Sequence, residues 1–93
     1  MKIKIGFAGL SHLGIISSLA CADKKIDTIA YDGNKLIVEK LYKSQNIISE
    51  KGVTEALIKN IKSKKIIFTD QIKDLRKCNV IIISKDLNTN NFG

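Results

Sequence analysis

The sequence has few of the residues that bind metals or form disulfides. Its 93 residues include two cysteines and one histidine. Cys21 and Cys78 each lack a second cysteine at C-x-x-C spacing, and His12 stands alone. Metal sites need several such ligands at short spacing. We therefore expect no metal site, and we expect both cysteines to be reduced structural thiols that do not act as nucleophiles.

Arginine and aromatic residues are also scarce. Aromatic residues make up 5% of the chain, and Arg76 is the only arginine. The net charge of +7 therefore comes from lysines, which are scattered along the chain without aromatic residues between them. Nucleic-acid recognition favours arginine clusters and stacking aromatic side chains. We expect no specific nucleic-acid partner, and non-specific binding through the net charge is the least favoured hypothesis.

Long hydrophobic runs are missing as well. The longest, such as Val80–Ile83, have the length of a strand, whereas a membrane-spanning helix needs about 20 apolar residues. A glycine-rich turn interrupts the apolar run at the N-terminus where the core of a signal peptide should continue. These features predict a cytoplasmic protein without a membrane partner.

What the sequence does contain is a nearly complete dinucleotide-binding fingerprint. Residues 2–8 alternate apolar with small or polar residues and predict a strand. The segment GLSHLG follows at residues 9–14 and reads G-x-S-x-x-G, where the fingerprint is G-x-G-x-x-G. Gly9 permits the tight turn that ends the strand, and Gly14 allows the next helix to approach it closely. This arrangement predicts a pyrophosphate site at the start of that helix.

The middle of the fingerprint differs from the pattern. Ser11 stands where a second glycine lets the backbone come near the pyrophosphate. The added hydroxymethyl group is tolerated if it points away or donates to a phosphate oxygen, and it blocks the site otherwise. The backbone amides of His12 and Leu13, at the positive end of the helix dipole, are the expected donors to the phosphates.

An acidic residue follows at the expected distance from the fingerprint. Asp32 ends the next apolar run, where a carboxylate accepts hydrogen bonds from the adenosine ribose. An acid there favours NAD, because it would repel the 2′-phosphate of NADP. The alternative is that Asp32-Gly33-Asn34 only forms a turn, as these residue types often do. Combined with the fingerprint, the dinucleotide interpretation is favoured.

The apolar periodicity predicts the other elements of the chain. Strands are expected at 26–31, 65–68 and 79–83, and helices at 11–22, 35–44, 53–62 and 70–77, with Asp70 as the N-cap of the last helix. The strand at 79–83 is apolar on both faces, which is typical of a central parallel strand. Residues 45–51 are expected to form a loop, and 86–93 are polar and without predicted structure.

Alternation of strands and helices implies parallel strands joined by right-handed crossovers. The predicted class is therefore α/β, a Rossmann-like, partial doubly wound parallel sheet of about four strands with helices on both faces. Residues 1–93 would form the N-terminal part of a dinucleotide-binding domain. Because the sequence stops just after a strand, we expect it to be a fragment or a truncated form.

Four segments together resemble a particular family. These are GLSHLG, IAYDGNKLIVEKL, SEKGVTEALIKN and IIFTDQIKDLRKCNVIII. In order and spacing they are similar to the N-terminal NAD-binding domain of the UDP-glucose/GDP-mannose dehydrogenase family. That family shows G-x-G-x-V-G, Y-D-x-N-x-x-x-V-x-x-L, E-P-G-L-x-E-L-L and D-V-I-x-I-x-V segments. The resemblance covers essentially the whole chain.

The chain departs from the family pattern at several nucleotide-binding positions. Besides Ser11, residues 50–53 read EKGV in place of E-P-G-L, and the chain has no proline. Ile37 occupies a position where the family often has a basic residue near the ribose, for which Lys35 is a substitute. Residues 85–89 replace the T-P-T-D loop. The apolar framework is intact, so the pattern fits a fold that is kept while nucleotide binding is weakened.

The resemblance implies NAD as the cofactor and a nucleotide sugar as substrate only within a longer parent enzyme. The family's catalytic cysteine and its helper residues belong to later parts of such a chain, so no catalytic residue is assigned here. The alternative is a degenerate Rossmann-like module that binds a nucleotide or pairs with copies of itself through its exposed last strand. The residues expected to bind the cofactor are Gly9, Ser11, His12, Leu13, Gly14, Asp32 and Lys35.

Overall fold

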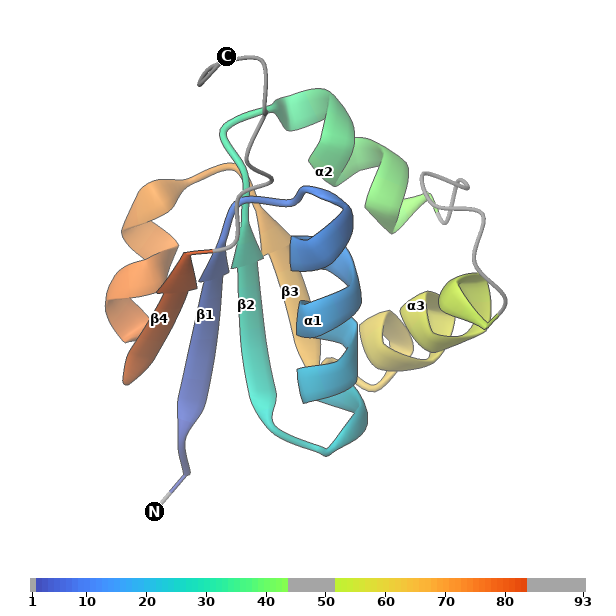
Figure 1. Ribbon diagram of the computed structural model, residues 1–93, viewed down its shortest axis with the longest axis horizontal. Coiled ribbons are helices and arrows are strands. Elements are labelled where there is room, and N and C mark those ends of the chain that lie inside the picture. The colour runs from blue at the N-terminus through green and yellow to red at the C-terminus, as the bar shows by residue number, and fades with distance from the viewer. Residues whose placement is uncertain (1, 44–51, 84–93) are drawn as a thin grey trace, which may run out of the picture.

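A four-stranded parallel sheet forms the centre of the protein (Figure 1). The computed structural model describes residues 2–43 and 52–83. Its strands lie in the order β3-β2-β1-β4, and every neighbouring pair is parallel. Their bounds are β1 (Lys4–Ala8), β2 (Asp27–Tyr31), β3 (Ile66–Thr69) and β4 (Val80–Ile83). The predicted α/β class with a Rossmann-like parallel sheet is confirmed.

Helices cover both faces of the sheet, but unequally. The three α-helices contribute buried side chains to one core, and the single 3₁₀-helix η1 packs on the opposite face. Strand β1 shows this division, because Phe7 belongs to the core beneath α1 while its neighbour Gly6 lies against Leu75 of η1. The helices are α1 (His12–Asp23), α2 (Lys35–Tyr42), α3 (Val53–Lys62) and η1 (Ile72–Lys77).

The core lies between the sheet and the three α-helices. Each of its members exposes less than a tenth of its surface, and together they come from the sheet and from all three α-helices. Four polar residues are buried as well, namely Ser18, Thr28, Asn60 and Thr69, and Asn60 of α3 is 2% exposed. Its side-chain amide donates to Asp23 Oδ1 at 2.7 Å and to the Ala56 carbonyl at 2.9 Å, so it ties α3 to the end of α1. The largest core side chains are Phe7, Leu10, Ile15, Leu19, Leu41, Leu57, Ile66 and Phe68.

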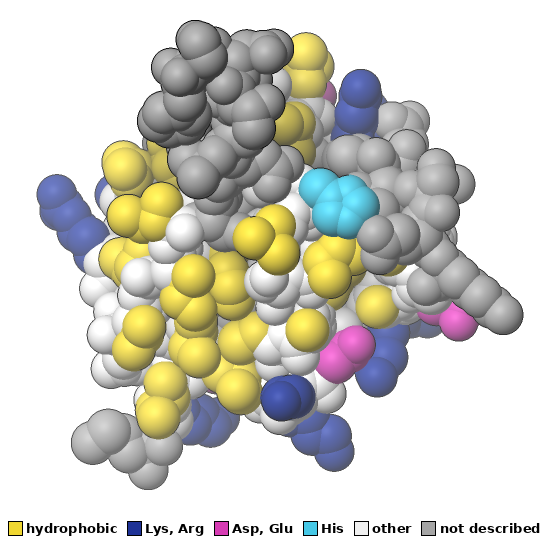
Figure 2. Space-filling view, viewed as in Figure 1, with side chains coloured by type: hydrophobic (Ala, Val, Ile, Leu, Met, Phe, Trp, Pro, Cys, Tyr) yellow, Lys and Arg dark blue, Asp and Glu magenta, His cyan; other side chains and the backbone are white. Residues whose placement is uncertain are grey.

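The prediction of a central position for the last strand is wrong for the described residues. Strand β4 lies at the edge of the sheet and pairs with β1 alone. Its four residues are between 42% and 79% exposed. Figure 2 shows hydrophobic side chains gathered on the near face over β4 and β1. Apolarity on both faces predicted burial on both sides, yet no described element covers this strand or its outer edge.

The predicted N-cap of the last helix is also wrong. The residue before η1 is Gln71, and its backbone amide donates to the Thr69 hydroxyl at 3.0 Å. The same hydroxyl donates to Asp74 Oδ2 at 2.6 Å. Asp70 instead accepts from the Gln71 side chain at 2.9 Å. Thr69 therefore supplies the local hydrogen bonds that were expected from Asp70.

The other elements agree with the predictions to within two residues where they are described. Helix α3 has the predicted bounds, and the strand β1 begins at Lys4, two residues after the predicted start. Strand β3 is displaced by one residue towards the C-terminus. The expected loop at 45–51 and the segment at 86–93 lie outside the described residues.

Tyr42 protects the outer edge of the sheet at β3. Its hydroxyl accepts from the Phe68 backbone amide and donates to the Phe68 carbonyl, each at 2.8 Å. The two rings pack edge to face, with their centroids 5.6 Å apart. Because β3 pairs only with β2, these backbone groups have no strand partner. One side chain thus satisfies both polar groups of an edge residue that would otherwise be open to another strand.

Replacing Tyr42 by phenylalanine should lower the free energy of unfolding by about 1 kcal/mol at neutral pH, because both hydrogen bonds are lost. Burial raises the pKa of Tyr42, and the hydrogen bond with the Phe68 backbone partly opposes this. The unfolded chain therefore ionises first, near pH 10. The stabilising contribution is complete below that pH and is lost as pH rises through the raised pKa.

Urea unfolding of the wild type and Tyr42→Phe, measured from pH 7 into the alkaline range, checks this prediction. The stability difference between the two should shrink above about pH 10. Tyr31→Phe is the matched control, because the Tyr31 hydroxyl makes no hydrogen bond with the described residues. A difference that stays constant throughout the alkaline range would contradict the assignment.

Candidate functional site

The predicted fingerprint residues lie at the carboxyl ends of β1 and β2, where parallel sheets bind ligands. Gly9 follows β1 directly and has a positive φ of 108°, a conformation that a side chain would penalise. Its amide donates to the Tyr31 carbonyl at 2.8 Å, which holds the turn against the end of β2. The glycine at this position is therefore required by the turn, as the sequence predicted.

Ser11 is the N-cap of α1. Its backbone is extended, with φ −70° and ψ 178°, so a side chain is accommodated without strain. The hydroxyl oxygen accepts from the Gly14 amide at 3.3 Å. The added hydroxymethyl group is therefore directed back onto the first turn of α1. The hydroxyl proton is not used in this bond and can be donated to an anion.

The first turn of α1 presents the amides expected to meet phosphates. His12 and Leu13 are its first two residues, and their side chains are exposed. Gly14 is buried, and its amide is already bonded to Ser11. First-turn amides have no partner within the helix, and no acidic side chain lies in this turn to compete for them. The positive end of the helix dipole therefore meets the fingerprint loop. The acidic group beside this loop is the Asp32 carboxylate, which comes from the end of β2 and accepts from the Leu10 amide.

Asp32 joins the fingerprint loop to the end of β2. Its Oδ2 accepts from the Leu10 amide at 2.9 Å, and its Oδ1 accepts from the Asn34 amide at 2.8 Å. A carboxylate oxygen has two acceptor positions, so each oxygen keeps one for a further donor. These two bonds bear differently on the alternative that this segment only forms a turn. The Asn34 bond is that turn, but the Leu10 bond spans 22 residues of sequence.

Lys35 lies close to Asp32 in sequence but is not fixed against it. It is the first residue of α2 and is exposed. Asn34 caps this helix, because its side-chain oxygen accepts from the Leu36 amide at 3.0 Å. The structure thus places Lys35 at the rim of the same edge of the sheet, and its side chain makes no hydrogen bond or ion pair with residues 2–43 and 52–83.

Two contributors to this site were not identified from the sequence. Leu10 is 3% exposed and anchors the fingerprint loop in the core while its amide holds Asp32. The carbonyl oxygen of Thr69 accepts a hydrogen bond from the Asp32 backbone amide at 3.1 Å. The apolar residue inside the fingerprint was a signal for the first of these. The second depends on the pairing of β2 with β3, which no local pattern reveals.

The residues present fit a dinucleotide. A loop that turns at a positive-φ glycine, a helix start without acidic residues and a hydroxyl with a free proton provide donors for phosphate oxygens. A carboxylate at the end of the next strand provides an acceptor for sugar hydroxyls. The donors for the phosphates and the acceptor for a sugar thus lie at the same edge of the sheet, as the binding of a dinucleotide requires.

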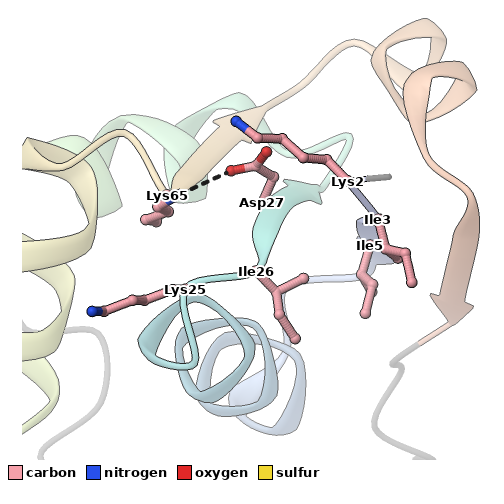
Figure 3. Close-up of a pocket in the computed structure, with 7 residues that line it drawn as sticks. All are labelled: Lys2, Ile3, Ile5, Lys25, Ile26, Asp27 and Lys65. Carbon is pink, nitrogen blue, oxygen red and sulfur yellow. Dashed lines mark hydrogen bonds and ion pairs between the residues drawn. The ribbon is translucent and has the colours of Figure 1, made fainter.

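A separate cavity of about 290 Å³ lies at the opposite, amino-terminal ends of the strands (Figure 3). It is lined by lysines and isoleucines together with Asp27. Asp27 is paired with Lys65 at 3.4 Å, and the Lys25 side chain extends away from this pair in Figure 3. Among the described residues that line it, none belongs to a glycine-rich loop or to the start of a helix, which are the features that bind the pyrophosphate of a dinucleotide.

Cys21 and Cys78 are both free thiols. Burial raises the pKa of the Cys78 thiol against an opposing effect of Lys4, which keeps it protonated and a poor nucleophile. Within the described ranges, no three His, Cys, Asp or Glu side chains come together as a metal site, and no helix is long and apolar enough to cross a membrane.

Comparisons with known proteins agree on one family. Residues 3–90 match the model of the UDP-glucose/GDP-mannose dehydrogenase family, NAD binding domain. Among curated proteins, none matches the chain. Among solved structures, UDP-D-ManNAc dehydrogenase from Pyrococcus horikoshii is 25% identical with a TM-score of 0.85, covering 89% of this chain and 20% of that one.

Two further structures show the same proportions. UDP-glucose dehydrogenase from Pyrobaculum islandicum is 23% identical with a TM-score of 0.84, covering 91% of this chain and 20% of its own. UDP-N-acetyl-mannosamine dehydrogenase Cap5O from Staphylococcus aureus is 26% identical with a TM-score of 0.79, covering 88% and 19%. The chain thus spans about one fifth of the length of the dehydrogenases that it matches.

Ser11→Ala should lower the free energy of unfolding by about 1 kcal/mol, because it removes the side-chain cap of α1. Ser11→Gly should cost only a few tenths of a kcal/mol, since glycine is itself an acceptable N-cap. Thermal and urea unfolding of the three proteins check the order. Equal stabilities of Ser11→Ala and the wild type would show that the hydroxyl does not cap the helix in solution.

Proposed function

Since this chain belongs to the UDP-glucose/GDP-mannose dehydrogenase family and corresponds to its NAD-binding domain, we propose that it binds NAD at the carboxyl ends of β1 and β2. The residues proposed to hold the cofactor are those predicted from the sequence. When bound, NAD supplies a hydride acceptor; everything else at the site is binding and orientation by the protein. The proposed contacts are made by Gly9, Ser11, His12, Leu13, Gly14, Asp32 and Lys35.

These residues would divide the ligand between them. The amides of His12 and Leu13 and the Ser11 hydroxyl would donate to the pyrophosphate. Gly9 and Gly14 would set the turn and the approach of α1, and contribute no side-chain contact. The carboxylate of Asp32 would accept from the ribose hydroxyls. Lys35, at the exposed start of α2, would approach the same nucleoside from solvent and contribute the least.

The observation that carries this proposal is the double hydrogen bond of Asp32. The carboxylate is held by the Leu10 and Asn34 amides at 2.9 and 2.8 Å. Its position relative to the fingerprint loop is therefore fixed before any ligand arrives. A pre-positioned acceptor costs less ordering on binding than a mobile one. A negative charge there also supports a preference for NAD over NADP.

Catalysis would need residues beyond those assigned to cofactor binding in this chain. We propose that oxidation of a nucleotide sugar takes place only in a longer parent enzyme, with this part supplying the cofactor site. The cytoplasm is the proposed compartment, supported by the two free cysteines. The expectation that copies of the chain associate stays a prediction.

Asp32→Ala should weaken NAD binding by about tenfold or more, because one acceptor for the ribose is lost along with the anchor of the fingerprint loop. Isothermal titration calorimetry with NAD measures the change. Asp70→Ala is the matched control, since Asp70 is an acid at the carboxyl end of the neighbouring strand β3 and bonds only a neighbouring side chain. Its affinity for NAD should equal that of the wild type.

The same titrations with NADP should give weaker binding to the wild type than NAD does, and the gap should narrow in Asp32→Ala because the repelling charge is gone. Circular dichroism confirms that each variant is folded. If the wild type does not bind NAD at millimolar concentration, the proposal is wrong. If Asp32→Ala binds NAD as well as the wild type does, the role of that carboxylate is refuted while the cofactor stands.

A further inference from the structure

Lysines gather at the edge of the sheet where β1, β2 and β3 begin. Because these neighbouring strands are parallel, the segments that precede them lie side by side. Figure 1 shows this edge at the end of the strands opposite α2 and the proposed cofactor site. The fold thus brings together lysines that are scattered in the sequence. This lysine edge consists of Lys2 before β1, Lys24 and Lys25 before β2, and Lys64 and Lys65 before β3.

The acids beside the lysine edge are already paired. Asp27 lies 3.4 Å from the Lys65 ammonium, and Asp23 lies 3.6 Å from the ammonium of Lys59 in α3. Within residues 2–43 and 52–83, no acidic side chain forms an ion pair with the other lysines of the edge. The edge therefore carries positive charge that the described part of the chain does not neutralise.

Two of these lysines occupy backbone positions that favour glycine. Lys25 and Lys64 have positive φ angles of 65° and 60°. Each follows the end of a helix, where glycine or asparagine usually adopts this conformation because a larger side chain is disfavoured. Cations also stabilise the C-terminal end of a helix, but α3 already has Lys59 and Lys62 in its last turn. Stabilisation of that helix end therefore does not account for a lysine at position 64.

Two neighbouring cavities open at the lysine edge. The first, of about 290 Å³, lies among the starts of the strands, and the second, of about 170 Å³, lies between the ends of α1 and α3. Lys25 and Lys65 line both cavities. The Lys25 side chain points away from the pair of Asp27 and Lys65 in Figure 3, so its ammonium is directed to solvent rather than to that acid. An extended anion lying across both cavities would meet cationic side chains along its length.

The kinds of side chain at this edge indicate what they would recognise. The segments that form it, residues 2–4, 23–27 and 59–65, contain no arginine and no aromatic residue. Without aromatic side chains there is no platform on which bases stack, and without guanidinium groups there is no bidentate recognition. Lysine ammonium groups act as compact point charges. The edge is therefore suited to a ligand whose recognised feature is closely spaced negative charge.

We propose that the lysine edge binds inorganic polyphosphate, a chain of phosphate groups joined by single oxygen atoms. Adjacent charges are closer together in this chain than in a nucleic acid, where a sugar separates the phosphates. Because β2 lies between β1 and β3, Lys25 would contact the middle of the bound segment, between Lys2 and Lys64. NAD has only two linked phosphates, so it would not span this edge, and the two sites would act separately.

Isothermal titration calorimetry of the protein with medium-chain sodium polyphosphate tests this proposal. Lys25→Glu with Lys64→Glu should weaken binding by at least about tenfold, because both charges are reversed at the centre of the edge. Lys40→Glu with Lys73→Glu is the matched control. It changes the net charge equally at exposed positions of α2 and η1, and should weaken binding by less than about twofold because distant exposed charges are screened.

A second double variant separates lost binding from lost folding. Lys25→Gly with Lys64→Gly removes both charges, and glycine adopts a positive φ without strain. Binding of polyphosphate should weaken, while the melting temperature should not fall below that of the wild type. Circular dichroism on the same samples measures that temperature.

Three results would overturn the proposal. An equal loss of affinity in the control variant would attribute binding to net charge alone. An oligothymidylate with the same number of phosphates that binds as tightly as polyphosphate would assign the edge to nucleic acid. Displacement of polyphosphate by NAD would place it at the cofactor site. Since the cofactor proposal is tested by titration with NAD alone, either proposal can fail while the other stands.

Discussion

The carboxylate of Asp32 connects two loops that lie far apart in the sequence, and the carboxyl edge of the sheet depends on that connection. Its bond to the Leu10 amide fixes the fingerprint loop, and its bond to the Asn34 amide fixes the turn into α2. The Gly9 amide adds a third tie, to the end of β2. The starts of two helices are thereby held at one place, which is what a ligand with separated phosphates and sugars requires.

Within the described residues, the two faces of the sheet are covered to different degrees. Three helices and a continuous core support the face of α1, so the cofactor edge rests on a rigid framework. The face of η1 has a short 3₁₀-helix and an exposed edge strand. At the far edge, the Tyr42 hydroxyl closes the backbone of β3. No described residue does the same for β4, whose side chains are the most exposed of the four strands.

Local patterns predicted what depends on local physics. Apolar spacing gave the bounds of α3, and the glycines placed the turn after β1. Predictions failed where the outcome depends on distant parts of the chain. The apolar run at 80–83 indicated a central strand, but β4 lies at the edge of the described sheet. Apolar residues on both faces of a strand favour burial, but they do not specify the strand's neighbours. The Asp70 cap failed for a local reason, because the hydroxyl of the preceding residue, Thr69, accepts from the Gln71 amide instead. The Leu10 bond to Asp32 needs β1 and β2 side by side, which only the folded sheet provides.

The position of the cofactor is the central claim, and amide chemical shifts test it most directly. In ¹H–¹⁵N correlation spectra of the ¹⁵N-labelled protein titrated with NAD, the largest shifts should fall on residues 9–14 and 32–35. Small shifts elsewhere should follow the elements that these loops begin. Shifts concentrated instead around Lys2, Lys25 and Lys65, at the opposite end of the strands, would contradict the account.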